Sequence, residues 1–235
     1  MSDRNAPNEV GSPKGTAGYG EEADELVVQY EGVTFEEVHS DVLHLVPTLP
    51  GRILDVGAGT GRDAAALAGR GHSVVAVEPT RELRAHGQRI HAGCGINWVD
   101  DSLPGLVLGQ HAGRFNAVFA TAVWMHLASE EREVAIARVA ALLVPGGLFF
   151  IHLRHGPVPD QRHMFDVSAA ETAELGRRHG LWPIHRSERP DLHGRDSVHW
   201  SCLVLQTDDS SRELVPTRNS SALLEIPQLD QNLTH

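Results

Sequence analysis

A glycine-rich stretch at residues 52–62, RILDVGAGTGR, constrains the fold of this chain more than any other segment. It opens with apolar and β-branched residues, which are typical of a strand buried on both faces. Asp55 lies near the end of this run, and Gly57, Gly59 and Gly61 follow it. The alanine-rich segment after the glycines has high helix propensity. The sequence therefore predicts a strand, a tight turn and a helix, an arrangement in which backbone can approach a ligand closely.

The spacing of the glycines distinguishes between two classes of nucleotide ligand. A dinucleotide-binding turn has the pattern G-x-G-x-x-G/A, and here Arg62 occupies the place of the third small residue. Asp55 puts a negative charge at the strand end, which would repel a pyrophosphate and attract a cationic ligand group. The pattern D-x-G-x-G-x-G therefore disfavours a nicotinamide-dependent oxidoreductase.

The composition divides the chain into four regions. Residues 1–20 are rich in Gly, Pro, Ser and Asn and are predicted to be a disordered tail. Residues 21–50 carry apolar residues at helical spacing and are predicted to form a helical cover, with Thr34 capping one helix. Residues 51–207 are predicted to be the main domain. Residues 208–235 turn polar and are predicted to be a flexible tail.

Strand and helix signals alternate along the main domain. Further strands are expected at residues 73–77, 96–99, 115–121, 148–153, 181–187 and 198–206. Helices are expected at residues 63–70, 81–91, 130–143 and 168–179. Such alternation predicts an α/β fold with a mostly parallel sheet that is covered on both faces. Pro183 cannot donate to a central ladder, so its strand is expected at a sheet edge.

Five short motifs, in this order, resemble those of class I S-adenosylmethionine-dependent methyltransferases. They are DVGAGTG at 55–61, Glu78 after the second strand, DSLP at 101–104, the segment 115–127 with WMHL at its end, and LVPGGL at 143–148. The resemblance covers about residues 53 to 207. It implies a Rossmann-like sheet of seven strands in the order 3-2-1-4-5-7-6, with the seventh strand antiparallel, helices on both faces and an N-terminal helical cover.

The resemblance also implies that S-adenosylmethionine is the cofactor. The residues expected to bind it are Tyr30, Asp55, Gly57, Ala58, Gly59, Gly61, Glu78, Pro79, Asp101, Ser102, Leu103 and Thr121. Glu78 stands about twenty residues after the glycines, where an acid can accept hydrogen bonds from ribose hydroxyls. Asp100 and Asp101 compete for the adenine side, and Asp101 fits the Leu-Pro that follows it better.

An acceptor pocket is expected between the helical cover and the loops after the fourth and fifth strands. The candidates for catalysis there are His39, His126, Arg154 and His155. A histidine titrates near neutral pH and could take a proton from an acceptor hydroxyl or amine. The alternative is catalysis by positioning alone, without a base.

The bulk composition limits the partners of the chain. A formal net charge of −11 disfavours binding to a nucleic-acid backbone. No apolar run reaches membrane-spanning length and no signal-peptide core is visible, so a cytoplasmic protein is expected. Cys94 and Cys202 are interpreted as buried small apolar residues. The 15 histidines include no H-E-x-x-H motif and no cysteine or carboxylate spacing typical of zinc, so no metal is expected.

The motifs and the resemblance together predict a methyltransferase that acts on an O or N atom of a small molecule, as a monomer or homodimer. Two alternatives stay open. One is methylation of tRNA or protein, although the acidic charge balance argues against RNA. The other is a non-catalytic protein of the same fold that binds S-adenosylmethionine.

Overall fold

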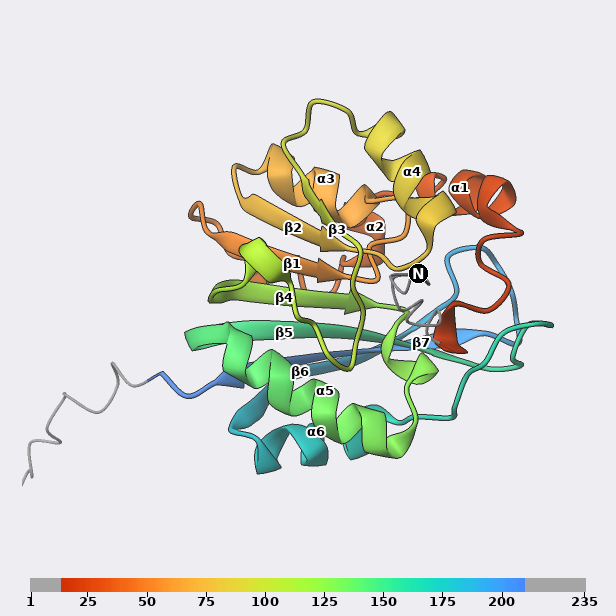
Figure 1. The fold of residues 1–235 in the computed structure, drawn as a ribbon. Helices are drawn as coiled ribbons and strands as arrows, with labels where there is room; N and C mark the ends of the chain where they lie inside the picture. Colours follow the sequence, from red (N-terminus) through yellow and green to blue (C-terminus); the bar gives the residue numbers. More distant parts are fainter. Residues whose placement is uncertain (1–13, 210–235) are drawn as a thin grey trace, which may run out of the picture.

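A seven-stranded sheet runs through the centre of the computed structural model, which describes residues 14–209 (Figure 1). The strands are β1 (Arg52–Val56), β2 (Ser73–Val77), β3 (Asn97–Val99), β4 (Phe115–Thr121), β5 (Leu143–His155), β6 (Leu181–Pro190) and β7 (His199–Thr207). Their order is β3-β2-β1-β4-β5-β7-β6, and β7 pairs antiparallel with both β5 and β6. The predicted strand order is therefore confirmed. Pro183 lies on the edge strand β6, next to a shift in register.

Helices cover both faces of this sheet (Figure 1). The α-helices are α1 (Ala23–Glu31), α2 (Phe35–Val38), α3 (Arg62–Gly69), α4 (Arg81–Ile90), α5 (Ser129–Leu142) and α6 (Ala169–Arg178). Short 3-10 helices are η1 (Lys14–Thr16), η2 (Leu43–Leu45), η3 (Gly109–His111) and η4 (Trp124–His126). Among the helices that the structure describes, none combines the length and apolar character needed to cross a membrane.

The core consists of two apolar layers, one on each face of the sheet. Successive side chains of a strand point to opposite faces. Ile53 accordingly joins the cluster that contains Ala64 and Leu67 of α3, whereas Leu54 joins the cluster that contains Ile136 of α5. Both strand residues are fully buried, which explains why β1 reads as a continuous apolar run rather than an alternating one.

The helical cover is broken into short segments on the α3 side of the sheet. Thr34 caps α2: its side chain accepts a hydrogen bond from the amide of Glu37 at 3.1 Å, and the Glu37 carboxylate accepts one from the amide of Thr34 at 2.7 Å. This confirms the predicted cap. Phe35, Val38 and Val42 of the cover are buried, so the cover is fixed to the sheet by apolar packing.

Residues 14–20 correct the predicted limit of the N-terminal tail. They begin with η1, and the Tyr19 side chain packs beside Leu26 of α1. The guanidinium of Arg162 lies 4.0 Å from the centre of the Tyr19 ring. A single aromatic residue thus anchors a segment whose composition alone suggests disorder. Residues 14–22 are called the N-terminal strap below. The rest of both predicted tails, residues 1–13 and 210–235, lies outside the described residues.

The two cysteines differ in exposure. Cys202 of β7 is buried, as predicted, but Cys94 is exposed in the turn after α4, where the prediction was wrong. The segment around Cys94 is rich in glycine and packs few side chains, so it provides no apolar layer to cover a thiol.

Candidate active site

A cavity of about 750 Å³ opens at the carboxyl ends of the parallel strands. Its walls come from the turn after β1, the ends of β2 and β4, the N-terminal strap, α1, and the loops that follow β5 and β6. In doubly wound α/β folds, ligands bind at this edge of the sheet. The sheet therefore brings residues from distant parts of the sequence to one opening.

The glycine turn after β1 gives the cavity a wall of exposed backbone. Gly57 and Gly59 have φ angles of +65° and +57°, in the left-handed region that favours glycine. A Cβ atom at Gly57 would collide with the side chain of Val123, and one at Gly59 would lie 3.4 Å from the Tyr30 ring. Both glycines are therefore needed for the shape of the turn and for the close approach of a ligand.

Asp55 places a carboxyl group with unused acceptor capacity at the floor of the cavity. Its side chain is buried at the end of β1, and Oδ2 has no hydrogen-bond partner among the described residues. Burial raises the pKa of Asp55 well above its usual range, and the nearby charge of Asp63 raises it further. A cationic ligand group beside Asp55 would stabilise the ionised carboxylate, which burial and Asp63 disfavour.

Asp63, in the first turn of α3, carries the negative charge of this pair. It accepts hydrogen bonds from Nε2 of His39 at 2.9 Å, from Nε of Arg62 at 2.8 Å and from the Thr121 hydroxyl at 3.2 Å. Burial opposes its ionisation, but the charges of His39 and Arg62 outweigh burial and hold the pKa of Asp63 well below its usual value. Asp55 therefore tends to hold its proton, whereas the neighbouring Asp63 tends to stay ionised.

Glu78 joins the end of β2 to the glycine turn. Its Oε2 atom accepts a hydrogen bond from the Gly59 amide at 2.8 Å, and Oε1 accepts one from the Thr80 amide at 2.8 Å. Burial raises the pKa of Glu78, although these amides favour the ionised form. The carboxylate is held rigidly at the cavity wall, as an acceptor for ligand hydroxyl groups requires.

The structure brings most of the expected cofactor residues together. Those that line the cavity are Tyr30, Asp55, Gly57, Ala58, Gly59, Glu78, Pro79, Ser102, Leu103 and Thr121. Gly61 and Asp101 are not among the lining residues. Gly61 lies in the turn against Trp98. The Asp101 carboxylate accepts hydrogen bonds from the amides of Ser102 and Leu108, both at 2.7 Å, and so stabilises its own loop. Asp100 forms an exposed ion pair with Arg84.

The four catalytic candidates divide equally. His126 and Arg154 line the cavity, and His39 and His155 do not. His39 is fully buried beneath the cover, where it binds Asp63. His155 forms a 2.8 Å hydrogen bond with Ser201 and stacks on His199 in a separate hollow. His39 lies away from the cavity because it is buried at the end of α2, and His155 does so because neighbouring residues of β5 point to opposite sides.

His126 has both ring nitrogens engaged. Nδ1 lies 2.7 Å from the carbonyl oxygen of His163, so the ring proton is donated there. Nε2 then accepts a hydrogen bond from the Tyr19 hydroxyl at 3.1 Å. Burial lowers the pKa of His126, which keeps the ring neutral. The cavity therefore presents a tyrosine hydroxyl with a neutral histidine behind it.

The β5–β7–β6 side of the cavity is rich in guanidinium groups. The arginines that line it are Arg154, Arg162, Arg189 and Arg195. Arg195 pairs with Asp191 through two hydrogen bonds of 2.8 and 2.9 Å, and Arg162 pairs with Glu22 at 2.5 Å. Arg154 forms no ion pair within residues 14–209, and its buried Nη1 atom has no hydrogen-bond partner there. Burial and the neighbouring Arg195 lower the pKa of Arg154.

Sequence reasoning missed several lining residues of this side. They are Tyr19, Arg162, Arg189, Asp191, Arg195 and Trp200. Tyr19 could have been noticed as an aromatic residue in an otherwise polar segment. The others lie on the loop after β5 and the β6–β7 hairpin, which carry no motif, and only the fold brings them to the cavity.

Comparison with known proteins agrees with this geometry. A family model described as "Methyltransferase domain" matches residues 53–147, which hold the glycine turn, Glu78 and the ends of β3 and β4. The matched region is thus similar to class I methyltransferase domains. An uncharacterised methyltransferase of Bacillus cytotoxicus is 30% identical over 123 residues, which are 51% of this chain and 54% of that protein. One from Mycobacterium bovis is 34% identical over 112 residues, 47% and 55% of the two chains. The methyltransferase match thus spans about half the length of these curated relatives.

Solved methyltransferase structures share the fold over most of the chain. The 1,6-didemethyltoxoflavin-N1-methyltransferase of Burkholderia thailandensis, solved with 1,6-didemethyltoxoflavin and S-adenosylhomocysteine, has a TM-score of 0.56 at 23% identity and covers 89% of this chain and 93% of its own. The magnesium protoporphyrin IX methyltransferase of Synechocystis, solved with S-adenosylhomocysteine, has a TM-score of 0.63 at 16% identity, with coverages of 81% and 96%. At these identities the likeness shows the methyltransferase fold.

Proposed function

We propose that this methyltransferase domain is an active enzyme, which transfers a methyl group from S-adenosylmethionine to an O or N atom of a small molecule that carries an anionic group. The observation that carries the proposal is the charge distribution of the cavity. Among the described residues, Asp55 offers an unpartnered carboxyl oxygen on the β1 side, and Arg154 offers a guanidinium without an ion pair on the β5 side. Such a cavity suits a cationic methyl donor next to an anionic acceptor.

The residues on the β1 side fit the donor. S-adenosylmethionine supplies an activated methyl group on a sulfonium cation. Asp55 would attract the positive charge, and the turn at Gly57 and Gly59 would let the backbone reach the ligand. Glu78 would accept hydrogen bonds from the ribose hydroxyls, because its carboxylate is already fixed at the end of β2.

The residues on the other side support the anionic acceptor. A guanidinium group can form two parallel hydrogen bonds to a carboxylate or phosphate, which fixes orientation as well as affinity. Arg195 and Arg162 already use their charges on Asp191 and Glu22. Arg154 is free for such a contact within the described part of the chain, and it stands at the end of a central strand. A rigid strand end can position an acceptor accurately for in-line transfer.

The Tyr19–His126 pair is the proposed route for a proton. As an acceptor hydroxyl or amine loses its proton to the Tyr19 oxygen, Tyr19 can pass its own proton to Nε2 of His126, the atom that it already contacts. General-base catalysis of this kind contributes about 10²- to 10⁴-fold. Tyr19→Phe and His126→Gln should therefore lower kcat by a similar factor. Positioning alone would leave kcat and its pH dependence unchanged in both variants.

The first test of the proposed function is binding. Calorimetric titration with S-adenosylmethionine should show one site per chain, and titration with NADH should show none. NADH binding without S-adenosylmethionine binding would favour an oxidoreductase and refute the proposal.

The second test is transfer of an isotopically labelled methyl group. Incubation with labelled S-adenosylmethionine and a metabolite extract should place label in a small anionic molecule. Arg154→Met should raise KM for that acceptor by about 10- to 100-fold and leave S-adenosylmethionine affinity unchanged, because one charge-assisted contact is lost. Arg178→Met, a change at an exposed ion pair with Glu133, is the control. Label in tRNA or protein, or binding without transfer, would support the two alternative functions.

A further inference from the structure

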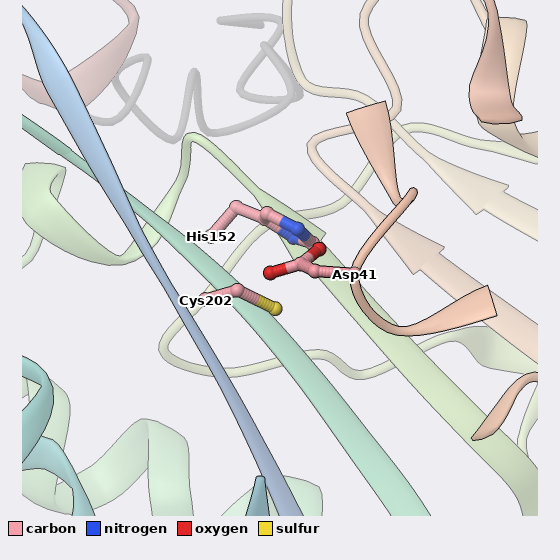
Figure 2. A group of neighbouring side chains, drawn as sticks. All are labelled: Asp41, His152 and Cys202. Carbon is pink, nitrogen blue, oxygen red and sulfur yellow. The ribbon is translucent and has the colours of Figure 1, made fainter. Parts of the chain in front are cut away.

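Three side chains that are far apart in sequence come together between the helical cover and the sheet (Figure 2). Asp41 comes from the cover between α2 and η2, His152 from β5 and Cys202 from β7. His152 and Cys202 are direct cross-strand partners, so their side chains leave the sheet on the same face. One oxygen of Asp41, one ring nitrogen of His152 and the Sγ atom of Cys202 all lie within 4.8 Å of one another.

Several buried polar atoms of the cluster have no hydrogen-bond partner among the described residues. His152 is fully buried, and neither of its ring nitrogens has a hydrogen-bond partner among the described residues. The buried Oδ1 atom of Asp41 lacks a partner in the same range, although the Ser187 hydroxyl donates to the other oxygen, Oδ2. Buried polar groups are nearly always paired, so three such atoms at one point call for a ligand.

We propose that Asp41, His152 and Cys202 bind one zinc ion. Carboxylate, imidazole and thiolate groups are the ligands that zinc takes in proteins, with bonds of about 2.0–2.3 Å. Tetrahedral geometry at these bond lengths separates neighbouring ligand atoms by about 3.5 Å. The three atoms lie within 4.8 Å of one another, so small side-chain rotations would be enough to reach this spacing. Three protein ligands leave the fourth position for water.

The protonation of the cluster agrees with metal binding. Burial raises the pKa of the Cys202 thiol, and the nearby Asp41 carboxylate adds to this, so the sulfur keeps its proton in the free protein. Zinc displaces that proton as the Zn–S bond forms. Burial lowers the pKa of His152, which leaves the ring in the neutral form that can coordinate a metal. The positive charge of Arg189 opposes a cation here, and the two anionic ligands, Asp41 and the Cys202 thiolate, offset it.

The position of the cluster suggests what the ion would do. Asp41 belongs to the helical cover and the other two ligands belong to the sheet, so the ion would fix the cover to the sheet. Asp41 keeps 23% of its side-chain surface exposed, which provides a path for the metal from solvent. The ring of His39 lies edge-on against His152, with ring centres 4.6 Å apart, and His39 binds Asp63 at the cavity wall. Through His39, the ion would therefore help to fix the position of Asp63 at the cavity wall.

Cobalt(II) can be used to test for the site, because it binds in place of zinc and its bond to a thiolate gives a charge-transfer absorption band. The full chain is stripped with a chelator, kept reduced, and titrated with Co²⁺ and then with Zn²⁺. We expect one Co²⁺ per chain with the thiolate band, and loss of that band when Zn²⁺ displaces the cobalt. Bound metal should also raise the midpoint of thermal unfolding.

Variants assign the ligands. Cys202→Ser should abolish the thiolate band, and Asp41→Asn should weaken Co²⁺ binding by at least about tenfold. Cys94→Ser is the matched control, since it removes the exposed cysteine and should leave band and affinity unchanged. Circular dichroism in the presence of chelator checks that each variant folds. If Cys202→Ser does not fold, Asp41→Asn, a change at a partly exposed position, still tests the proposal. A wild-type chain without the band, or a band that persists in Cys202→Ser, would overturn the proposal.

Discussion

At the scale of single residues, the glycines of the turn after β1 allow both a left-handed backbone conformation and close access for a ligand. Gly59 combines a φ angle of +57° with a position next to the Tyr30 ring, so a side chain there would strain the backbone and fill the space beside the ring. Left-handed backbone costs an L-residue about 1–2 kcal/mol, and the added side chain would also occupy ligand space. We expect Gly59→Val to remove measurable S-adenosylmethionine binding in calorimetry and to leave a folded protein.

Gly93 provides the control for this substitution. It has a φ angle of +90° but no atoms within 4 Å of an added Cβ, and it does not line the cavity. Gly93→Val should therefore carry a similar backbone strain and retain full affinity. Equal affinity in the Gly59 and Gly93 variants would show that the turn does not contact the cofactor.

Asp55 is the residue whose protonation should control cofactor affinity. Its raised pKa means that it holds a proton as pH falls, whereas a cationic ligand favours the charged carboxylate. S-adenosylmethionine affinity should therefore rise with pH until Asp55 is ionised. Asp55→Asn should weaken binding about 10- to 100-fold and flatten this dependence, because a contact with a charged group is lost. Calorimetry between about pH 5.5 and 8.5 measures both effects. Asp100→Asn, at an exposed acid, should keep the wild-type profile.

At the scale of elements, Arg162 makes three contacts with the N-terminal strap. Arg162 contacts the Tyr19 ring, donates to the Glu22 carboxylate at 2.5 Å and donates to the carbonyl of Ala17 at 3.3 Å. The strap lines the cavity, so its release should open a path for the ligand. Arg162→Met should accelerate hydrogen exchange in residues 14–22 and raise the dissociation rate of S-adenosylmethionine several-fold. Arg178→Met is the matched control, and equal exchange in both variants would contradict this role for Arg162.

The same elements show what the sequence could and could not predict. The glycine turn and the acid at the end of β2 follow from local patterns, because each depends on residues that are close in the chain. The strand order came from the family resemblance, since it depends on pairing between distant segments such as β1 and β4. The hydrogen bonds that the Asp101 carboxylate accepts from two backbone amides of its own loop could not be read from the sequence. The strap and the β6–β7 hairpin depend on contacts between distant segments, such as Arg162 with Glu22, which no local pattern records. The Asp41–His152–Cys202 cluster could not be predicted from local patterns either, since its three residues come from three separate segments of the chain.

At the scale of the whole molecule, buried acids and histidines make opposite contributions to the pH dependence of stability. Asp55 and Glu78 have raised pKa values, so the folded chain holds their protons more tightly than the unfolded chain. These acids therefore favour folding at low pH and lose that contribution as pH rises. His126 and His152, whose pKa values are lowered by burial, act in the other direction. The pH dependence of stability is a sum of both, and single groups are separated only by comparing variants.

His152 should make the folded chain sensitive to mild acid. Its pKa lies well below the usual value because of burial, with the charges of His39 and Arg189 adding to the effect. Above about pH 6.5 neither the folded nor the unfolded chain protonates this ring, so its contribution to stability is complete. Below that pH the unfolded chain binds a proton that the folded chain excludes, and the free energy of unfolding falls by up to about 1.4 kcal/mol per pH unit.

The measurement is denaturant unfolding, with a chelator present, at several pH values between about 7.5 and 5. His152→Asn removes the titrating ring, so this variant should lose stability less steeply than the wild type as pH falls. His44→Asn changes an exposed histidine of the cover and should keep the wild-type slope. Equal slopes in all three proteins would mean that His152 takes up a proton in the folded chain as easily as in the unfolded one. That result would contradict the strong desolvation that its position between β4 and β7 imposes.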